Sequence, residues 1–255
     1  MSSMPEKLLN NTTCVLSPLG DSAIVITFGN EIKYDIHKKI KMFMDLLEDE
    51  PFVGFIECVP AFTNLTVFYD PLVIYKKQKQ SNNDELSSPY EVVRSILERK
   101  LQWLKEDKKL THRTVSIPVC YGDEYGPDLE YVARYNNLTT DEVIHIHSNG
   151  EYLAYMIGFA PGFPFLGGLS EKISTPRRSS PRMTIPTGAV GIAGMQTGVY
   201  PISTPGGWQL IGQTPTKLFL PNVNPPSLLQ AGDIVKFHPI SNQEYKEIIL
   251  KEGLQ

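Results

Sequence analysis

The chain has 255 residues, enough for one or two domains, and an ordinary globular composition of 41% hydrophobic and 20% charged residues with a net charge of −4. No apolar run approaches the ~20 residues that span a bilayer, so the composition excludes a membrane-spanning helix. A nucleic-acid-binding surface needs a broad basic face, which this acidic chain lacks, so we expect neither a membrane nor a nucleic acid as partner.

The N-terminal segment predicts no targeting signal. It lacks the charged region followed by an apolar stretch that a secretory signal peptide requires. The three cysteines, Cys14, Cys58 and Cys120, are far apart, and their spacing fits neither a disulfide framework nor a metal site. Free thiols are typical of reducing compartments, and we therefore expect a cytoplasmic protein.

Strand and helix periodicities alternate through the first part of the chain. Residues 22–28 alternate apolar side chains and predict a strand. After Asn30, a good helix cap, apolar residues recur every three or four positions as far as Leu47 and predict an amphipathic helix. Residues 52–59 and 64–69 then predict two strands joined as a hairpin.

A polar segment at 76–87 predicts a surface loop, and the capping-box spacing of Ser88 and Glu91 predicts a second helix after it. Residues 113–120 predict a further strand. The resulting order β-α-β-β-α-β is that of a ferredoxin-like arrangement, but the last strand can instead open a second domain. We expect a small α+β domain at residues 1–110.

The remainder of the chain predicts short elements separated by turns. These elements are two helices at 128–136 and 140–148, three strands at 151–159, 217–220 and 233–237, and a terminal helix that starts near Ser241. Many short strands with turns between them favour a closed or partly closed barrel. We place this mainly-β barrel domain, which would carry the active site, at residues 111–255.

One stretch, residues 158–215, differs from the rest of the chain. It holds 11 of the 19 glycines and 8 of the 20 prolines but few charged side chains. Because Gly costs about 1 and Pro about 3 kcal/mol in a helix interior, this composition predicts short strands and tight turns. The stretch also contains aromatic residues that can be buried, which disordered segments lack. We expect its backbone to come close to a ligand.

Three arginines, Arg177, Arg178 and Arg182, gather in the segment TPRRSSPR. The flanking prolines restrict the backbone, and planar guanidinium groups suit a carboxylate or a phosphate. A solvated basic loop is the alternative. Since other charges are nearly absent nearby, we favour a site for a small anion. The sequence has no Walker-type phosphate loop.

Other parts of the stretch predict a polar cleft lined by glycine. Residues 158–165, GFAPGFPF, offer backbone N–H groups that can face an oxyanion, although a packed turn under a barrel is compatible with the same residues. Gln196 and Thr197, like Trp208 and Gln209, follow glycines closely. Their polar groups serve either a ligand or the local backbone, and the sequence does not separate the two.

Histidines offer little to the site. His147 precedes the stretch and can approach its cavity, although a structural histidine held by hydrogen bonds is the simpler interpretation. A metal-binding pair on a helix is spaced by four residues, whereas His145 and His147 are two apart. We therefore expect no metal site.

Four motifs, GFAPGFPFLGGL, TPRRSSPR, VGIAGMQTGVYP and PGGWQLIGQTP, occur in an order that resembles the family of the 5-oxoprolinase B subunit (PxpB). This family is also called allophanate hydrolase subunit 1 or KipI, the inhibitor of a sporulation kinase. Related domains are fused within urea carboxylases. The resemblance covers most of the chain and implies a small α+β domain followed by a cyclophilin-like barrel of the carboxyltransferase type.

The resemblance also implies an activity, the ATP-dependent conversion of 5-oxo-L-proline to L-glutamate. It implies a heteromeric complex with two partners, a paralogous C subunit and a LamB/YcsF-type A subunit, without which the chain is inactive, and ATP with Mg²⁺ as co-substrate of the complex. The residues expected to be catalytic are Arg177, Arg178, Arg182, Gln196 and His147. Those expected to bind substrate are Gly158, Phe159, Pro161, Gly162, Phe163, Phe165, Thr197, Trp208, Gln209 and Gly212.

A regulator that binds a sensor histidine kinase and blocks its autophosphorylation is the alternative function. The acidic N-terminal half of the chain can serve such docking. We prefer the role of an enzyme component, because an inhibitor has no need of a polar cleft lined by glycine.

Overall fold

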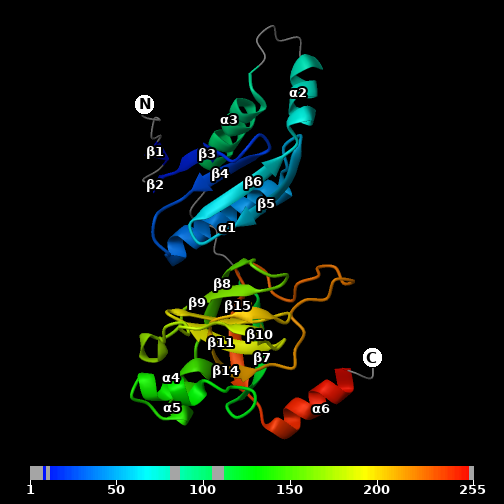
Figure 1. Cartoon of the computed structure of the whole chain (residues 1–255). Coiled ribbons are helices and arrows are strands. Elements are labelled where there is room, and N and C mark those ends of the chain that lie inside the picture. Colours follow the sequence, from blue (N-terminus) through cyan, green and yellow to red (C-terminus); the bar gives the residue numbers. More distant parts are fainter. Residues whose placement is uncertain (1–7, 10–11, 81–86, 105–111, 253–255) are drawn as a thin grey trace. The chain divides into compact units, whose positions relative to one another are not determined.

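The computed structural model describes residues 8–9, 12–80, 87–104 and 112–252. The chain forms two compact units, residues 1–111 and 112–255 (Figure 1). Each unit has a hydrophobic core of its own. None of the helices in the described ranges combines the length and apolarity that a membrane crossing needs.

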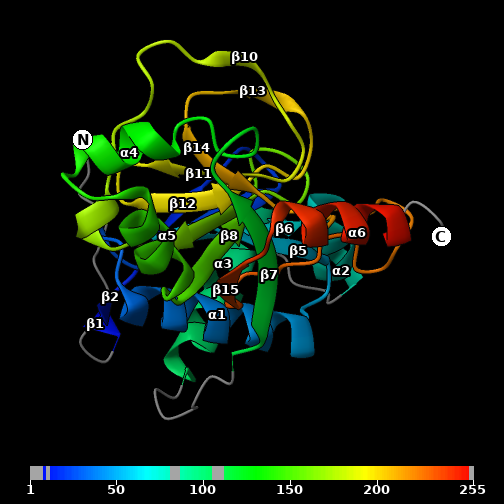
Figure 2. The ribbon, with the colours of Figure 1, turned by 90° about the horizontal axis from the view of Figure 1, so that it is seen from below.

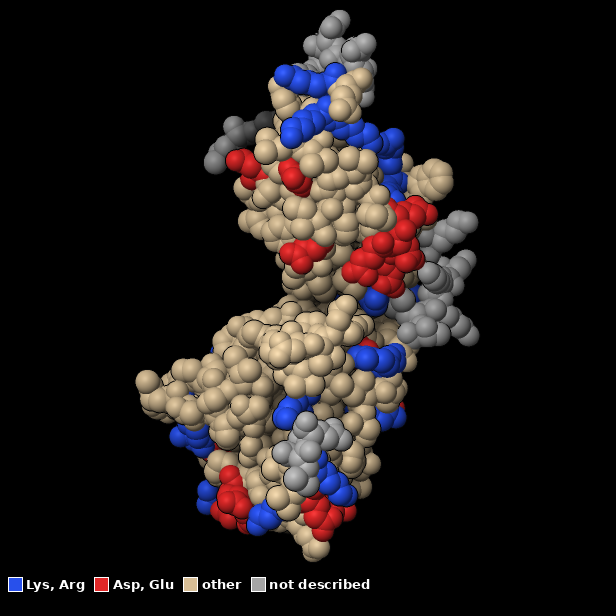
Figure 3. All heavy atoms as spheres, turned by 90° about the vertical axis from the view of Figure 1, so that its right-hand side faces the viewer, with Lys and Arg blue, Asp and Glu red and all other residues tan. Residues whose placement is uncertain are grey.

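The first unit is built on an antiparallel sheet with the strand order β3-β4-β6-β5. Its elements are β3 (Val15–Pro18), β4 (Ala23–Thr27), α1 (Tyr34–Asp49), β5 (Phe55–Pro60), β6 (Asn64–Tyr69), α2 (Pro71–Gln80) and α3 (Pro89–Gln102), preceded by the short pair β1 (Leu8–Leu9) and β2 (Thr12–Thr13). The alternation in β4 turns Ile24 and Ile26 to one face, where the core also includes Phe43 of α1 and Leu97 of α3. On the surface seen in Figure 3, acidic and basic side chains of this unit gather in separate patches.

The strand predicted at 113–120 belongs to the second unit, which is the alternative that the sequence left open. Two features of the first unit differ from the sequence prediction. A strand that we did not predict, β3, takes the outer position beside β4. The loop predicted at 76–87 is wrong in its first part, because α2 continues to Gln80. The Asp70 carboxylate caps this helix by accepting hydrogen bonds from the Leu72 and Val73 amides at 2.8 and 3.1 Å. Residues 81–86 lie outside the described residues.

The second unit contains a closed barrel, which confirms the predicted barrel. In the part of the chain that the structure describes, seven strands form it in the order β11-β12-β9-β8-β15-β7-β14. These strands are β7 (Thr114–Tyr121), β8 (Tyr152–Ile157), β9 (Pro164–Gly167), β11 (Ala189–Ala193), β12 (Gln196–Val199), β14 (Gln209–Gln213) and β15 (Ile234–Pro239). Paired neighbours run antiparallel except β7 and β15, which are parallel, so the barrel is mixed.

Further elements of the second unit surround the barrel. They are α4 (Leu129–Tyr135), α5 (Thr140–Ser148), the short 3₁₀ helix η1 (Glu171–Ile173), the strand pair β10 (Arg182–Ile185) with β13 (Thr204–Gly206), and α6 (Asn242–Glu252). Figure 2 shows β10 and β13 outside the barrel strands, on the side of β11 and β14. The strand predicted at 217–220 is wrong: this segment makes only an isolated bridge between Phe219 and Ser227. Prolines on both sides of it lack the N–H groups that a longer ladder needs.

Strand alternation divides the barrel into an inner and an outer face. Val190 and Ile192 of β11 belong to the interior core, whereas Ala189 and Ala193 of the same strand belong to a separate apolar cluster with Trp208. This outer cluster lies on the same side of the barrel as β10 and β13, and the candidate site lies over it.

Candidate functional site

A cavity of about 310 Å³ opens beside Trp208 on the outer face of the barrel. Its lining comes from three chain segments, the loop between β8 and β9, the segment before β10, and the region from Tyr200 to Trp208. The lining residues are Phe159, Phe163, Phe165, Arg177, Pro181, Tyr200, Pro205, Gly206, Gly207 and Trp208. The glycine- and proline-rich stretch therefore folds around one hollow of a size that suits a small molecule.

Phe163 is the centre of the aromatic wall. Its ring meets those of Phe159, Phe165, Tyr200 and Trp208 edge to face, with centroids 5.4, 5.1, 5.3 and 5.6 Å away. Such pairs contribute about 0.5–1.5 kcal/mol each beyond the burial of their area. Phe163 is buried, whereas Phe159 is 69% exposed. The wall is thus rigid at its base and open to solvent at its rim.

The loop before Phe163 uses most of its own backbone donors. The amides of Gly158, Ala160 and Phe163 donate to the carbonyls of Phe163, Gly158 and Ala160 within the loop. The expectation that this backbone presents a row of donors to a ligand is therefore reduced to the amides of Phe159 and Gly162. Phe159 has a φ of 66°, a left-handed conformation that is strained for an aromatic residue. Strain of this kind is concentrated at functional sites.

A glycine of β12 makes room for the base of the cavity. A Cβ added at Gly198 would lie 3.1 Å from Trp208 Cζ3 and 3.3 Å from Phe163 Cζ. Both rings therefore pack directly on the strand backbone, which no larger residue permits without a shift.

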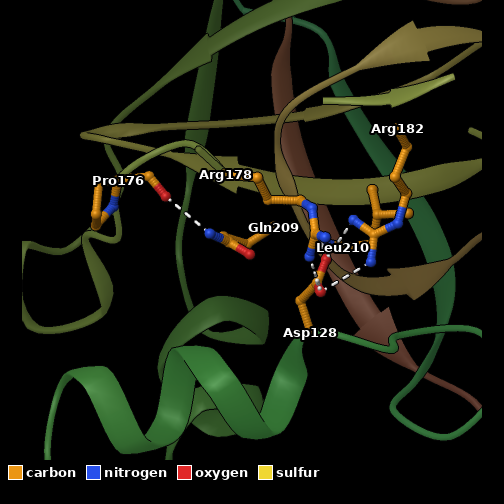
Figure 4. Close-up of polar contacts among 6 residues, drawn as sticks. All are labelled: Asp128, Pro176, Arg178, Arg182, Gln209 and Leu210. Carbon is orange, nitrogen blue, oxygen red and sulfur yellow. Dashed lines mark hydrogen bonds and ion pairs between the residues drawn. The ribbon is translucent and has the colours of Figure 1, made fainter. Parts of the chain in front are cut away.

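Two of the three predicted arginines bind a buried carboxylate that we did not predict. Asp128, which precedes α4, accepts hydrogen bonds from Arg178 Nη1 at 3.0 Å and from Arg182 Nη1 and Nη2 at 2.8 and 2.9 Å (Figure 4). It also accepts one from the Leu210 amide at 2.7 Å. The Asp128 side chain is only 7% exposed. This carboxylate joins the arginine segment, α4 and β14.

The arginine segment is tied at two further points next to Arg177. Gln209 Nε2 donates to the Pro176 carbonyl at 3.0 Å, and the Arg178 amide donates to the Gly207 carbonyl at 2.8 Å. Arg177 itself is exposed and lines the cavity. Among the described residues, its guanidinium has no acidic partner.

The Tyr200 hydroxyl lies close to the arginines. Burial raises its pKa, while a hydrogen bond with the Trp208 backbone and the charges of Arg177 and Arg182 act in the opposite direction. The net shift is upward, so Tyr200 is a neutral phenol at physiological pH. It adds a hydroxyl group, but no charge, to the cavity wall.

His147 lies in the barrel interior rather than at the cavity. Thr197 Oγ1 donates to the Gly191 carbonyl at 3.1 Å, so it accepts a hydrogen bond from His147 Nε2 at 2.8 Å. His147 Nδ1 then accepts a hydrogen bond from the Tyr121 hydroxyl at 2.8 Å. Burial lowers the pKa of His147 to about 3. This neutral, fully paired histidine fits the structural role and not that of a catalytic base.

The structure separates the predicted site residues into two groups. Phe159, Phe163, Phe165, Arg177 and Trp208 line the cavity. The others do not line it: Arg178, Arg182, Gln196, His147, Gly158, Pro161, Gly162, Thr197, Gln209 and Gly212. Thr197 faces the barrel interior, and Gln196 begins β12 at the hairpin opposite Ala193. Gly212 packs against β7, where an added Cβ would lie 2.7 Å from Val119 Cγ1.

Sequence reasoning missed Asp128 and Tyr200. Asp128 is 50 and 54 positions from its arginine partners, and no local pattern marks it. Tyr200 is an aromatic residue within one of the motifs that we singled out, VGIAGMQTGVYP, and this position was a usable signal. In the described ranges, no group of three or more His, Cys, Asp or Glu side chains is placed to hold a metal ion.

Comparison with known proteins places the whole site within one family. The family model "Carboxyltransferase domain, subdomain C and D" matches residues 14–229. The chain is 58% identical to the 5-oxoprolinase B subunit of Bacillus subtilis over 230 residues, which cover 90% of this chain and 94% of that protein. It is 40% identical to the 5-oxoprolinase B subunit of Escherichia coli O157:H7, with coverage of 87% and 94%.

A solved structure supports the fold independently. The chain resembles the crystal structure of the urea amidolyase of K. lactis with a TM-score of 0.72 and 19% identity. The match covers 98% of this chain and 16% of that much longer one. At this identity the likeness shows the fold alone.

Proposed function

The chain belongs to the family of the 5-oxoprolinase B subunit, and on that premise we propose that it is the lactam-binding component of an ATP-dependent 5-oxoprolinase. Such an enzyme converts 5-oxo-L-proline to L-glutamate. The substrate is a small flat ring with one carboxylate and one lactam amide. The cavity beside Trp208, with aromatic walls and a guanidinium without an acidic partner among the described residues, is the observation that carries the proposal.

The ligand fits the cavity group by group. The carboxylate pairs with Arg177, the cation of the lining. The ring packs against Phe163 and Trp208, which are rigid and buried. The lactam carbonyl is left to the Phe159 amide, since Gly162 does not line the cavity. The closed barrel likewise supports the cyclophilin-like fold that the resemblance implies.

A triphosphate does not fit this site as well as a carboxylate does. ATP carries several negative charges, whereas the guanidinium of Arg177 is the one cationic group among the described residues that line the cavity. In the complex, ATP supplies the activation of the lactam carbonyl, which is a poor electrophile. We assign no step of that activation to this chain, and we place ATP and Mg²⁺ with the rest of the complex.

The proposed role of this chain is to bind, orient and shield the lactam. Positioning of this kind contributes a large part of many catalytic rates. Among the described residues, the cavity lining contains no carboxylate, thiol or histidine that can act as a base. The Tyr200 hydroxyl also lines the cavity, but it is a neutral phenol with a raised pKa and does not serve as a base at neutral pH. A base must therefore come from elsewhere, which supports a heteromeric complex with a C subunit, paralogous to this chain, and with an A subunit of the LamB/YcsF type. It also supports inactivity of the chain alone.

The test is the Arg177→Gln variant in a complex purified with both partner proteins. Loss of one charge-assisted hydrogen bond should lower kcat/KM for 5-oxoproline by roughly tenfold to a hundredfold. Lys172→Gln is the matched control, because Lys172 is exposed, lies in the same stretch and does not line the cavity. Both lactam loss and ADP formation are measured.

Two results would contradict the proposal. The first is a wild-type complex in which lactam does not stimulate ADP formation. The second is an Arg177→Gln complex with the rate of the Lys172→Gln control. Inhibition of a sensor histidine kinase by a chain that supports no lactam consumption would favour the regulatory alternative.

A further inference from the structure

We infer that Asp128 is a positioning residue: it withdraws Arg178 and Arg182 from the cavity and leaves Arg177 as the group that recognises a ligand carboxylate. This inference rests on the proposed function and deepens it, because it states which charge recognises the substrate and which residue places that charge. It leaves the lining of the cavity with one guanidinium, that of Arg177, to pair with a carboxylate of the ligand.

The contacts of Asp128 use its acceptor capacity fully. Oδ1 accepts from Arg178 and Arg182, and Oδ2 accepts from Arg182 and from the Leu210 amide, all within 2.7–3.0 Å. The two hydrogen bonds from Arg182 form a bidentate pair, the strongest geometry for arginine and carboxylate. Arg178 and Arg182 keep further N–H donors, and Arg178 Nε is buried without a partner among the described residues. Neither residue lines the cavity, however, and moving either guanidinium into it would break contacts with a buried carboxylate.

Two further contacts, which do not involve Asp128, hold the backbone around Arg177. On its N-terminal side, the Pro176 carbonyl accepts from Gln209 Nε2, and on its C-terminal side, the Arg178 amide donates to the Gly207 carbonyl. The Arg178 side chain is held by Asp128. Arg177 is thus an exposed side chain on a fixed backbone, at the cavity that it lines.

Removing the negative charge of Asp128 tests its effect on ligand binding. With Asp128 ionised, one negative charge lies against the positive charges of Arg178 and Arg182. The Asp128→Asn variant removes that charge and most of the attraction that holds both guanidinium groups. If Arg178 and Arg182 bind the ligand in the native protein, the variant frees them from Asp128 and gains affinity for anions. If Asp128 serves to place Arg177, the variant loses selective affinity.

The experiment compares a carboxylate with its neutral counterpart. Binding of 5-oxoproline and of its carboxamide to the full chain is followed by the fluorescence of Trp208, which lines the cavity. The measurement uses a Trp103→Phe background, because Trp103 is the other of the two tryptophans and is 80% exposed. The ratio of the two Kd values does not depend on the fraction of folded protein, so a purely structural loss leaves it unchanged.

We expect the unaltered site to prefer the acid over the carboxamide by about tenfold, because one partner of the hydrogen bond becomes charged. Arg177→Gln should bring this ratio close to one. Asp128→Asn should lower it by at least about threefold, while Lys172→Gln should keep it. If Asp128→Asn does not fold, as judged by circular dichroism, Arg182→Gln replaces it. That variant keeps Arg177 and should lower the ratio less than Arg177→Gln does.

Several outcomes would overturn the inference. The first is a protein with the unaltered site that binds the acid no more tightly than the carboxamide. The second is an Arg177→Gln variant that still prefers the acid. The third is an Asp128→Asn variant whose preference for the acid is unchanged or increased. Turnover of lactam by the complex separates the two proposals. If the complex consumes lactam but the Kd ratios do not change as expected, only the role of Asp128 is wrong. If the Kd ratios change as expected but the complex consumes no lactam, only the enzymatic function is wrong.

Discussion

Acid should destabilise the second unit through His147, and the size of the effect follows from its burial. The pKa of this histidine falls from an ordinary value of 6.5 to about 3 in the folded chain, because burial disfavours the charged ring. Below its ordinary pKa, the unfolded chain binds a proton that the folded chain does not bind. Stability from this group is therefore complete at neutral pH and is lost as the pH falls from 6.5 towards 3. Between about pH 7.5 and about pH 5, the linkage relation gives a loss of about 2 kcal/mol.

The test uses His147→Gln, which removes the titration and keeps hydrogen bonding. A glutamine amide can donate to Thr197 and accept from Tyr121, the two partners of the ring nitrogens. At neutral pH this variant should lose about 1–2 kcal/mol through imperfect geometry. Its unfolding free energy should then fall by about 2 kcal/mol less than that of the wild type when the pH is lowered to about 5. His145→Gln, on the same helix but exposed, is the control and should keep the wild-type pH dependence.

The assay is urea unfolding of the full chain, followed by Trp208 fluorescence in the Trp103→Phe background, which reports on the second unit. Other groups also titrate in this range, but their contributions cancel in the difference between variant and wild type. Equal pH dependence of wild type and His147→Gln would refute the argument. It would mean that the folded chain accepts a proton at His147, or that the hydrogen-bonded chain through Tyr121 and Thr197 opens with little cost.

Three further predictions concern other parts of the second unit. Phe159→Gly relieves a φ of 66° but removes the ring contact with Phe163, and because these effects are each about 1 kcal/mol, the unfolding free energy should change by less than about 1 kcal/mol. The same variant should weaken 5-oxoproline binding, because Phe159 lines the cavity, and equal binding would contradict a role for this ring. Gly198→Ala places a Cβ 3.1 Å from Trp208 Cζ3 and should lower the unfolding free energy by about 1–3 kcal/mol. Because the added Cβ contacts the indole ring, the emission spectrum of Trp208 should change as well. Arg113→Gln breaks the ion pair with the buried Asp233 and should cost about 1–2 kcal/mol, because Arg113 is half exposed and the pair is screened; an unchanged melting temperature would show that the pair contributes nothing.

Local sequence patterns predict much of this structure. The alternation in residues 22–28 and the apolar periodicity after Asn30 predict β4 and α1, because each element buries one face in a shared core. The density of glycine and proline in 158–215 predicts turns and short strands, and the aromatic residues there form the cavity wall. In these cases the signal and the structure involve residues that are close together in the chain.

What sequence reasoning missed depends on distant pairings or on which face of a strand a residue occupies. Gln196, Thr197 and Gly198 are adjacent, yet Thr197 faces the barrel interior and Gly198 the base of the cavity. Only the register of the closed barrel decides this. Asp128 is a similar case, since its pairing with Arg178 and Arg182 exists only after α4 and the arginine segment have packed together.

The location of the cavity constrains how the chemistry can reach the lactam. In the described part of the chain, the barrel interior is filled by residues such as Val190, Ile192 and Phe237, and the cavity beside Trp208 lies on the outer face. Its base is buried at Phe163 and Trp208, whereas Phe159 at its rim is 69% exposed. Phosphoryl transfer to a lactam requires several charged groups and exclusion of water. On the proposed function, the face that offers the guanidinium of Arg177 would supply substrate recognition, and the partner proteins of the complex would supply the remaining charged groups.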